Sequence, residues 1–448
     1  MALVYLLALS LPPTAMIFFS RKRYSWLESL PSILWFFYMS LPFFFLNLYL
    51  ESKILKLQFV GIFLVSISFA ISDFIGHRFQ QTRIEVEESP AIYLRIKLIL
   101  ASVFLFLIPV FHIVVTDVIP FQLLISGNYA GFDLNDARQS FTKGAVFPFW
   151  LEILLAWYIP LIASISVYIL KLTLGKKVAV VAIVYVSIYS ILGLEKFPLI
   201  LFVFSLVLGL LYASKRVVTL EKIFVIFLVL FAIISNFYAQ KYVNDVKNDS
   251  SFVTSQEFLE SDLDGLITPS DTYRLETRAK SNIPAPILGF VYRTVLTPVD
   301  VSFRWYQYYS SSMMPKRNLL DVVLRKESPK ATNIVGRWAY TNRFPNKYTN
   351  YIDAYTSLDA DSYSFSGTLG TVYLCLLLLL LRIVLVKLKN TNNFSKFLYG
   401  ISISYLSIMS FSSGLISMLF SRGMLLIFLF MMFERFWFFH RKSLKRYL

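Results

Sequence analysis

The chain has 448 residues, of which 57% are hydrophobic and 16% are charged, against about 45–50% and about 25% in soluble globular proteins. With a mean hydropathy of +0.63, it cannot cover its apolar surface with polar side chains in water, so its composition excludes a soluble domain and predicts a polytopic membrane protein. A single cysteine excludes an intramolecular disulfide and a cysteine-based zinc site, and the sequence holds no glycine-rich nucleotide-binding signature.

Apolar runs of about 20 residues, enough to cross roughly 30 Å of hydrocarbon, recur along the chain. They predict eleven transmembrane helices, near residues 2–19, 27–50, 54–75, 97–119, 147–170, 178–194, 197–213, 222–240, 366–386, 397–412 and 414–433. We therefore expect an all-α membrane protein in three parts. Residues 1–240 hold eight spans and an extracytoplasmic loop at 120–146, residues 241–365 form a large extracytoplasmic loop with amphipathic or re-entrant helices, and residues 366–448 hold three spans and a basic tail.

The formal net charge of +16 is distributed unevenly along the chain. Basic residues concentrate in connections that alternate onto one side of the membrane: 21–23, 77–97, 171–177, 215–222, 382–396 and 435–446. The long loop on the other side is nearly balanced, with 15 basic and 14 acidic residues in 241–365. Because cytoplasmic loops carry an excess of Lys and Arg, we expect the basic side and the C-terminal tail to be cytoplasmic and the N-terminus to lie outside. This explains most of the charge without a nucleic acid partner.

The loop 241–365 is too long for a passive connector, and aromatic residues recur throughout it. Aromatic side chains mixed with Arg, Asn and Asp suit a surface that stacks on sugar rings and hydrogen-bonds their hydroxyls. An interfacial aromatic belt with snorkelling Arg side chains accounts for the same composition. Both interpretations remain open at this point.

Within this loop, residues 287–309 are amphipathic and too polar for a span, so we expect them at the membrane surface or re-entering it. Arg293 and Arg304 are eleven residues apart, three helical turns, and share one face of a continuous helix. Pro298 favours a kink or break between them.

Three more basic residues lie where a cavity open to the outside would need them. Arg138 follows an acidic stretch in the loop 120–146, Lys196 lies between two apolar runs, and Arg422 interrupts a third. An ionisable residue at membrane depth is costly and is a functional candidate by default. The alternatives are a wet turn at Glu195-Lys196 and an Arg422 side chain that snorkels to the outer interface.

One acidic cluster, Asp262 and Asp264, has the D-x-D spacing that lets two carboxylates share a divalent ion. Its neighbours form a polar, solvated stretch, and nucleotide sugars are not expected outside the cytoplasmic membrane. We therefore expect no metal site and no cofactor.

Four short motifs carry a resemblance to Wzy-type O-antigen polymerases, the repeat-unit polymerases of bacterial surface polysaccharides. They are Asp136-Ala137-Arg138, Gly193-Leu194-Glu195-Lys196-Phe197-Pro198, Tyr292-Arg293 with Pro298 downstream, and Ser366-Gly367-Thr368-Leu369-Gly370. In topology the resemblance covers nearly the whole chain and includes the GT-C-type polymerases and ligases. Some members carry a Gly eleven residues after each loop Arg; here those positions are Phe149 and Arg304, so a mechanism that needs this spacing is in doubt.

The resemblance implies a metal-independent glycosyltransferase of lipopolysaccharide biosynthesis in the bacterial inner membrane, with its site facing the periplasm. Such an enzyme transfers a glycan from undecaprenyl pyrophosphate to the non-reducing end of another lipid-linked unit, and a chain-length regulator protein is an expected partner. A departing pyrophosphate needs fixed positive charge, which Arg supplies with a bidentate fork.

We expect catalytic roles for Arg138, Arg293 and Asp136. The attacking hydroxyl needs a base, and Asp300 and Asp361 are alternatives to Asp136. Binding of pyrophosphate and glycan is expected from six other residues: Lys196, Arg304, Arg337, Arg422, Tyr292 and Trp305.

Two other functions compete with polymerisation. An O-antigen ligase shares the donor and architecture but usually has a His in the large outside loop, and residues 241–365 contain none. A flippase or transporter of lipid-linked sugars usually has evenly spaced spans and repeated halves, which are not apparent here.

Overall fold

The computed structural model describes residues 25–46, 53–79, 91–116, 118–126, 137, 140–141, 154–193, 196–213, 297–310, 316–323, 331, 334–335, 357–389, 392–411, 414–415, 418–419 and 423–447. This part of the chain is 94% helical and contains no strand, which confirms the all-α class for the residues described.

The α-helices are α2 Leu30–Trp35, α3 Leu41–Leu46, α4 Lys53–Phe79, α5 Ala91–Val115, α6 Pro120–Ser126, α9 Ser164–Thr173, α10 Lys176–Leu192, α11 Lys196–Ala213, α16 Thr297–Ser310, α17 Leu319–Val323, α19 Leu358–Ser366, α20 Thr368–Lys389, α21 Asn393–Ile408 and α22 Met424–Tyr447. Short 3₁₀ turns cover Ser25–Ser29 and Met409–Phe411. π-Helical segments cover Phe36–Ser40 and Tyr158–Ala163.

Four helical stretches of the described part are long and apolar enough to cross a membrane. They are Lys53–Gly76, Arg95–Val115, Leu154–Thr173 and Thr368–Lys389. All four coincide with predicted spans and indicate a membrane-embedded protein. Exposed apolar side chains on α5, such as Leu107 and Val114, are 60% and 77% accessible, as lipid-facing side chains are in the absence of lipid.

The other predicted spans fare differently. Those near 178–194, 197–213 and 397–412 coincide with the shorter helices α10, α11 and α21, whereas 2–19 and 222–240 lie outside the described residues. The number eleven stays a prediction.

Two predicted spans are not single continuous α-helices. The one near 414–433 starts too early, because α22 begins only at Met424, after Gly423 with a φ of 86°. That backbone conformation costs glycine little but would strain an L side chain. The one near 27–50 includes the π-helical segment Phe36–Ser40 between α2 and α3.

The chain divides into two compact units, each built from three segments distant in sequence. Unit 1 comprises residues 1–81, 250–386 and 406–418, and unit 2 comprises 82–249, 387–405 and 419–448.

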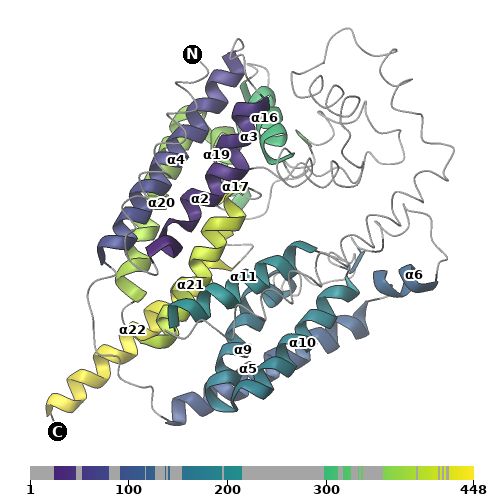
Figure 1. The fold of residues 1–448 in the computed structure, drawn as a ribbon, viewed down its shortest axis with the longest axis vertical. Coiled ribbons are helices and arrows are strands. Elements are labelled where there is room, and N and C mark those ends of the chain that lie inside the picture. Colours follow the sequence, from purple (N-terminus) through teal and green to yellow (C-terminus); the bar gives the residue numbers. More distant parts are fainter. Residues whose placement is uncertain are drawn as a thin grey trace. The chain divides into compact units, whose positions relative to one another are not determined.

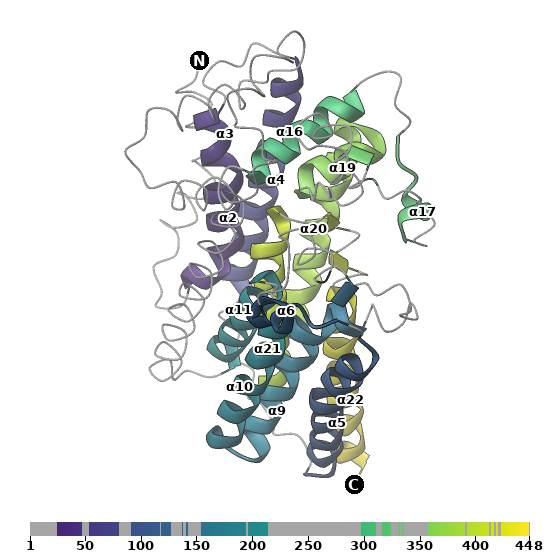
Figure 2. The ribbon, with the colours of Figure 1, turned by 90° about the vertical axis from the view of Figure 1, so that its right-hand side faces the viewer.

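Unit 1 is organised around α4. This helix packs against α2, α16 and α19, and the Ser68 hydroxyl donates to the Cys375 carbonyl of α20 at 3.0 Å. Figures 1 and 2 show α16 and α19 beside the same stretch of α4. The predicted outside loop therefore supplies helices that cover one part of a membrane span.

Unit 2 packs α5, α9, α10 and α11 together (Figure 1). Small residues let α11 approach α21 closely: a Cβ at Gly400 would lie 2.5 Å from the Leu208 carbonyl oxygen, and the Ser205 and Ser404 hydroxyls are 2.7 Å apart. Close backbone approach at Gly and Ser is typical of helix packing in membranes. The ring of Tyr168 stacks on that of Phe397, with centroids 4.0 Å apart.

Candidate functional site

The candidate site lies in unit 1, where α16 packs against α4. Pro298 is in the first turn of α16, where its missing N–H costs no helical hydrogen bond. The Gln58 side-chain amide donates to the Val299 carbonyl at 2.9 Å. The Tyr306 hydroxyl lies against Gly61, where any Cβ would overlap it. Gly61 therefore allows a buried tyrosine to contact the α4 backbone.

Helix α19 provides the second wall of the site and ends at the predicted Ser366–Gly370 motif. Gly367, with a φ of 64°, follows its last residue and separates it from α20. A Cβ at Gly370 would overlap the Ser362 carbonyl, so this glycine lets the two helices touch. The motif is thus a sharp helix–helix junction.

Asp359, in the first turn of α19, is fully buried. Its carboxylate accepts hydrogen bonds from the Ser357 hydroxyl and, at 3.3 Å, from the Ser302 hydroxyl of α16. Burial raises the pKa of Asp359 from 3.8 to about 6, and the two hydroxyl donors oppose this shift.

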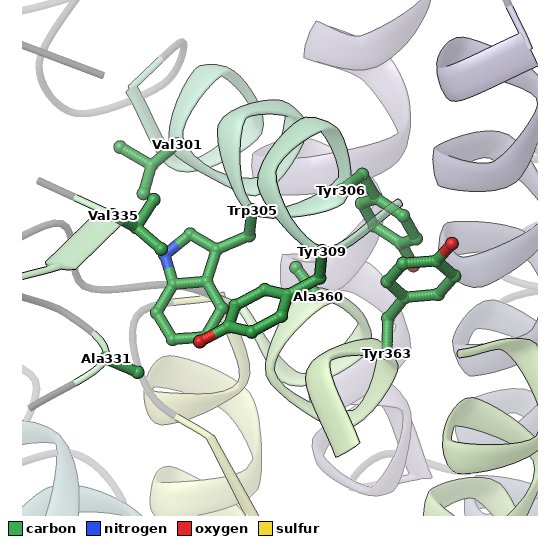
Figure 3. Packing of buried hydrophobic residues seen from close by; sticks show 8 residues of the cluster. All are labelled: Val301, Trp305, Tyr306, Tyr309, Ala331, Val335, Ala360 and Tyr363. Carbon is green, nitrogen blue, oxygen red and sulfur yellow. The ribbon is translucent and has the colours of Figure 1, made fainter. Parts of the chain in front are cut away.

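A cluster of aromatic rings fills the space between α16 and α19. In Figure 3, Trp305 lies beside Tyr309, while the rings of Tyr306 and Tyr363 face each other. The two ring centroids are 5.6 Å apart in the first pair and 4.5 Å apart in the second. These rings form a nearly water-free platform in unit 1.

An ion pair lies at the edge of this platform. The Arg317 guanidinium donates from Nη1 to the Asp361 carboxylate at 2.5 Å and to the Ser364 hydroxyl at 3.2 Å. It also lies over the rings of Trp305 and Phe365, at 5.3 Å and 4.8 Å. Its side chain is 9% exposed and that of Asp361 is 12% exposed. A cation between aromatic faces gains attraction from the ring quadrupoles, and more so where water is scarce.

Two further groups complete the surroundings of the pair. Gly414 lies so close to the Asp361 carboxylate that a Cβ there would overlap it. The Lys316 ammonium donates to the Tyr309 carbonyl at 2.5 Å and lies 4.7 Å from the centre of the Tyr363 ring. The site therefore holds two adjacent cations, one carboxylate in contact with a guanidinium, and aromatic walls.

Few of the residues predicted from the sequence fall in the part that the structure describes. Arg304 and Trp305 lie on α16 and are 2% and 1% exposed, so Trp305 packs within the protein in this structure. Asp361, one of the three candidate bases, is the partner of Arg317. Lys196 is the first residue of α11, and only its backbone is described.

The other predicted site residues lie outside the described residues: Arg138, Arg293, Asp136, Arg337, Arg422 and Tyr292, as do Asp262 and Asp264. For Asp300, only the backbone within α16 is described. Among the residues described, no three His, Cys, Asp or Glu side chains gather as metal ligands would.

Sequence reasoning missed Lys316 and Arg317. The signal was a basic doublet following Pro315 in a loop predicted to lie outside, a position at which membrane topology requires no positive charge. Its acidic partner lies 44 residues away, beyond any periodicity argument.

Comparison of the chain with protein families, with characterised proteins and with solved structures gives no match.

Proposed function

We propose that the protein is a membrane glycosyltransferase that polymerises lipid-linked oligosaccharide repeat units into surface polysaccharide. It transfers the growing glycan from undecaprenyl pyrophosphate to the non-reducing end of an incoming unit, as the resemblance to Wzy-type polymerases implies. The observation that carries the proposal is the Arg317–Asp361 pair, a guanidinium and a carboxylate held together over aromatic rings.

The chemistry needs both members of such a pair. A hydroxyl of the incoming unit attacks the anomeric carbon of the donor, the bond from that carbon to the pyrophosphate oxygen breaks, and the hydroxyl proton leaves to a base. Arg317 supplies a fixed charge for the departing pyrophosphate, and the Asp361 carboxylate supplies a proton acceptor. The low exposure of the site strengthens both effects, because little water screens the charges.

The proposed reaction also needs the site on the outer side of the membrane. Helices α4 and α20 begin at the ends that the charge pattern predicts to be outside, and α16 contacts α4 at Gln58 and Gly61, near that end. Reporter fusions after Lys280 and after Leu448 are expected to report opposite compartments, periplasm and cytoplasm. The same compartment for both would reject this orientation in the bacterial inner membrane.

The direct test is polymerisation by purified protein supplied with lipid-linked repeat units, with products resolved on a gel. Arg317→Ala should lower the rate by about 10²–10³, the usual cost of removing one preorganised donor to a developing negative charge. Arg317→Lys should recover part of it, because Lys keeps the charge but loses the planar fork. Arg78→Ala, an exposed Arg near the other end of α4, is the matched control and should polymerise normally. Full-length products from Arg317→Ala would remove the pair from the reaction.

Glycan length in cells separates polymerisation from the competing functions. Loss of a polymerase leaves single repeat units on the cell surface, loss of an O-antigen ligase leaves none, and loss of a flippase traps units inside. Single repeat units in a deletion strain, with long chains restored by the wild-type gene, are therefore the expected result.

A further inference from the structure

A short piece of the predicted outside loop 120–146 is anchored within unit 2. Of this piece the structure describes Ala137, Ser140 and Phe141. Ala137 is 6% exposed and Phe141 is 4% exposed, whereas Ser140 is exposed. Burial on either side of an exposed residue shows a segment packed against the protein by particular side chains.

His112 of α5 holds this segment by hydrogen bonds. Its Nε2 lies 2.7 Å from the Phe141 carbonyl oxygen, and its Nδ1 lies 2.6 Å from the Tyr189 hydroxyl of α10. A carbonyl oxygen only accepts, so Nε2–H donates to it; a neutral ring then accepts the Tyr189 hydroxyl proton at Nδ1. The imidazole thereby bridges two helices and a loop backbone.

The Phe141 side chain fits between the same helices. Its ring centroid is 4.4 Å from that of His112 and 6.4 Å from that of Tyr189. On another side it meets Gly193, the residue after α10, where a Cβ would lie 2.9 Å from one ring carbon and 3.0 Å from another. Because the φ of Gly193 is −80°, space rather than backbone conformation requires glycine there.

This arrangement connects two motifs that are far apart in the sequence. Arg138 directly follows Ala137 in the anchored segment, and Lys196 begins α11 three residues after Gly193. Both are basic residues that the sequence predicts at an outside-facing site. The contact between Phe141 and Gly193 therefore ties the loop that carries one to the helix junction that carries the other.

We infer that His112 is a positioning residue that fixes the segment 137–141, and with it Arg138, against the α10–α11 junction. This role rests on the proposed function, in which Arg138 helps to stabilise the departing pyrophosphate. His112 itself contacts the protein backbone and a tyrosine, and it acts on the reaction through the segment that it holds.

The anchoring can be tested without any activity. In a Cys375→Ser background, which removes the only natural cysteine, Ala137→Cys should react slowly with a membrane-impermeant maleimide and Ser140→Cys should react fast. Adding His112→Leu should raise the labelling rate of Ala137→Cys at least 10-fold and leave that of Ser140→Cys unchanged. Gly193→Ala, which pushes on Phe141 from another side, should act in the same way. Unchanged protection of Ala137→Cys in both variants would overturn the inference.

The effect on the reaction is measured with the same purified protein and lipid-linked units. His112→Leu should lower kcat at least 10-fold with a smaller change in KM, because a misplaced charge fails mainly in the transition state. His112→Gln should recover most of the activity and the protection, since its amide N–H can donate to the Phe141 carbonyl. Tyr158→Phe is the matched control: it removes a buried hydroxyl that donates to the Leu105 carbonyl at 2.6 Å and should change neither readout.

The two readouts separate this inference from the proposed function. No polymer from the wild-type protein would reject the function, while the labelling result would still decide whether His112 anchors the segment. Normal kcat in a His112→Leu variant whose Ala137→Cys has become reactive would reject the positioning role and leave the function standing.

Discussion

Each unit contains a buried ion pair that joins helices distant in sequence, and the two pairs are built differently. In unit 1, the Arg382 guanidinium of α20 contacts the Glu28 carboxylate at 2.5 Å and that of Asp73 at 3.8 Å, with all three side chains fully buried. In unit 2, the Lys97 ammonium of α5 contacts the Glu434 carboxylate of α22 at 2.6 Å, with 13% of the Lys97 side chain exposed.

The difference lies in the balance of charge and in the supporting groups. Two carboxylates share one guanidinium in unit 1, where the Ser32 backbone N–H and hydroxyl donate to Asp73. In unit 2 one carboxylate meets one ammonium, and the Asn392 amide donates to its second oxygen at 2.7 Å. The cation of unit 1 is thus indispensable to its acids, whereas Glu434 keeps a neutral partner if Lys97 is lost.

The largest expected effect is the loss of Arg382. Arg382→Met leaves Glu28 and Asp73 buried without their shared cation, which should cost about 3–5 kcal/mol of stability or prevent folding in the membrane. The thermal unfolding midpoint of the purified protein measures it. A triple variant with Glu28→Gln, Asp73→Asn and Arg382→Met should recover most of the loss, because no charge then remains buried. A stable Arg382→Met single variant would contradict this assignment.

Unit 1 also contains a further buried carboxylate, Asp359, which sharpens the comparison through pH. Its folded pKa of about 6 lies above the ordinary 3.8, so between these values the folded state holds the proton more often than the unfolded state does. Stability should therefore be highest below about pH 4 and fall by up to about 3 kcal/mol as the pH rises to about 6. Unfolding midpoints at pH 4.5 and 7.5 test this.

The variants for that test remove one carboxylate each. Asp359→Asn should lose this part of the pH dependence and be more stable than the wild type at pH 7.5. Asp321→Asn, on the neighbouring helix α17, should keep the wild-type dependence. A pH profile unchanged by Asp359→Asn would show that the charge of Asp359 costs little.

The smallest expected effect is in unit 2. Lys97→Met should cost about 1–3 kcal/mol, because Glu434 keeps its hydrogen bond to Asn392. Lys97→Met combined with Glu434→Gln should recover most of this loss. If Lys97→Met destabilises as much as Arg382→Met does, the contrast between the two units disappears.

Local patterns predicted the helices well where apolar runs are long. The spans near 54–75, 97–119 and 366–386 correspond to α4, α5 and α20, because continuous apolar runs of this length have few alternatives in a membrane. The start of α22 was missed because the region before Met424 is as apolar as the helix itself, so hydropathy does not mark the break at Gly423.

The charge pattern also misled in one place. Arg382 and Lys97 were assigned to cytoplasmic connections, whereas the structure includes them in membrane-spanning stretches, paired with acids 354 and 337 residues away. The Arg317–Asp361 and His112–Phe141 contacts are likewise long-range. Such pairs depend on which helices become neighbours, which hydropathy and charge counting in one sequence do not reveal.

The π-helical segment Tyr158–Ala163 has a consequence for how this chain tolerates insertions and deletions. A π-helical turn holds one residue more than an α-helical turn, so removing a residue there would restore a regular helix and rotate everything after it by about 100°. Tyr168 would then turn away from Phe397, on which it now stacks. A one-residue deletion at this place would leave the length and hydropathy of the span almost unchanged and still detach it from its neighbour. The reading frame of side chains along Leu154–Thr173 is therefore under a constraint that its composition does not show.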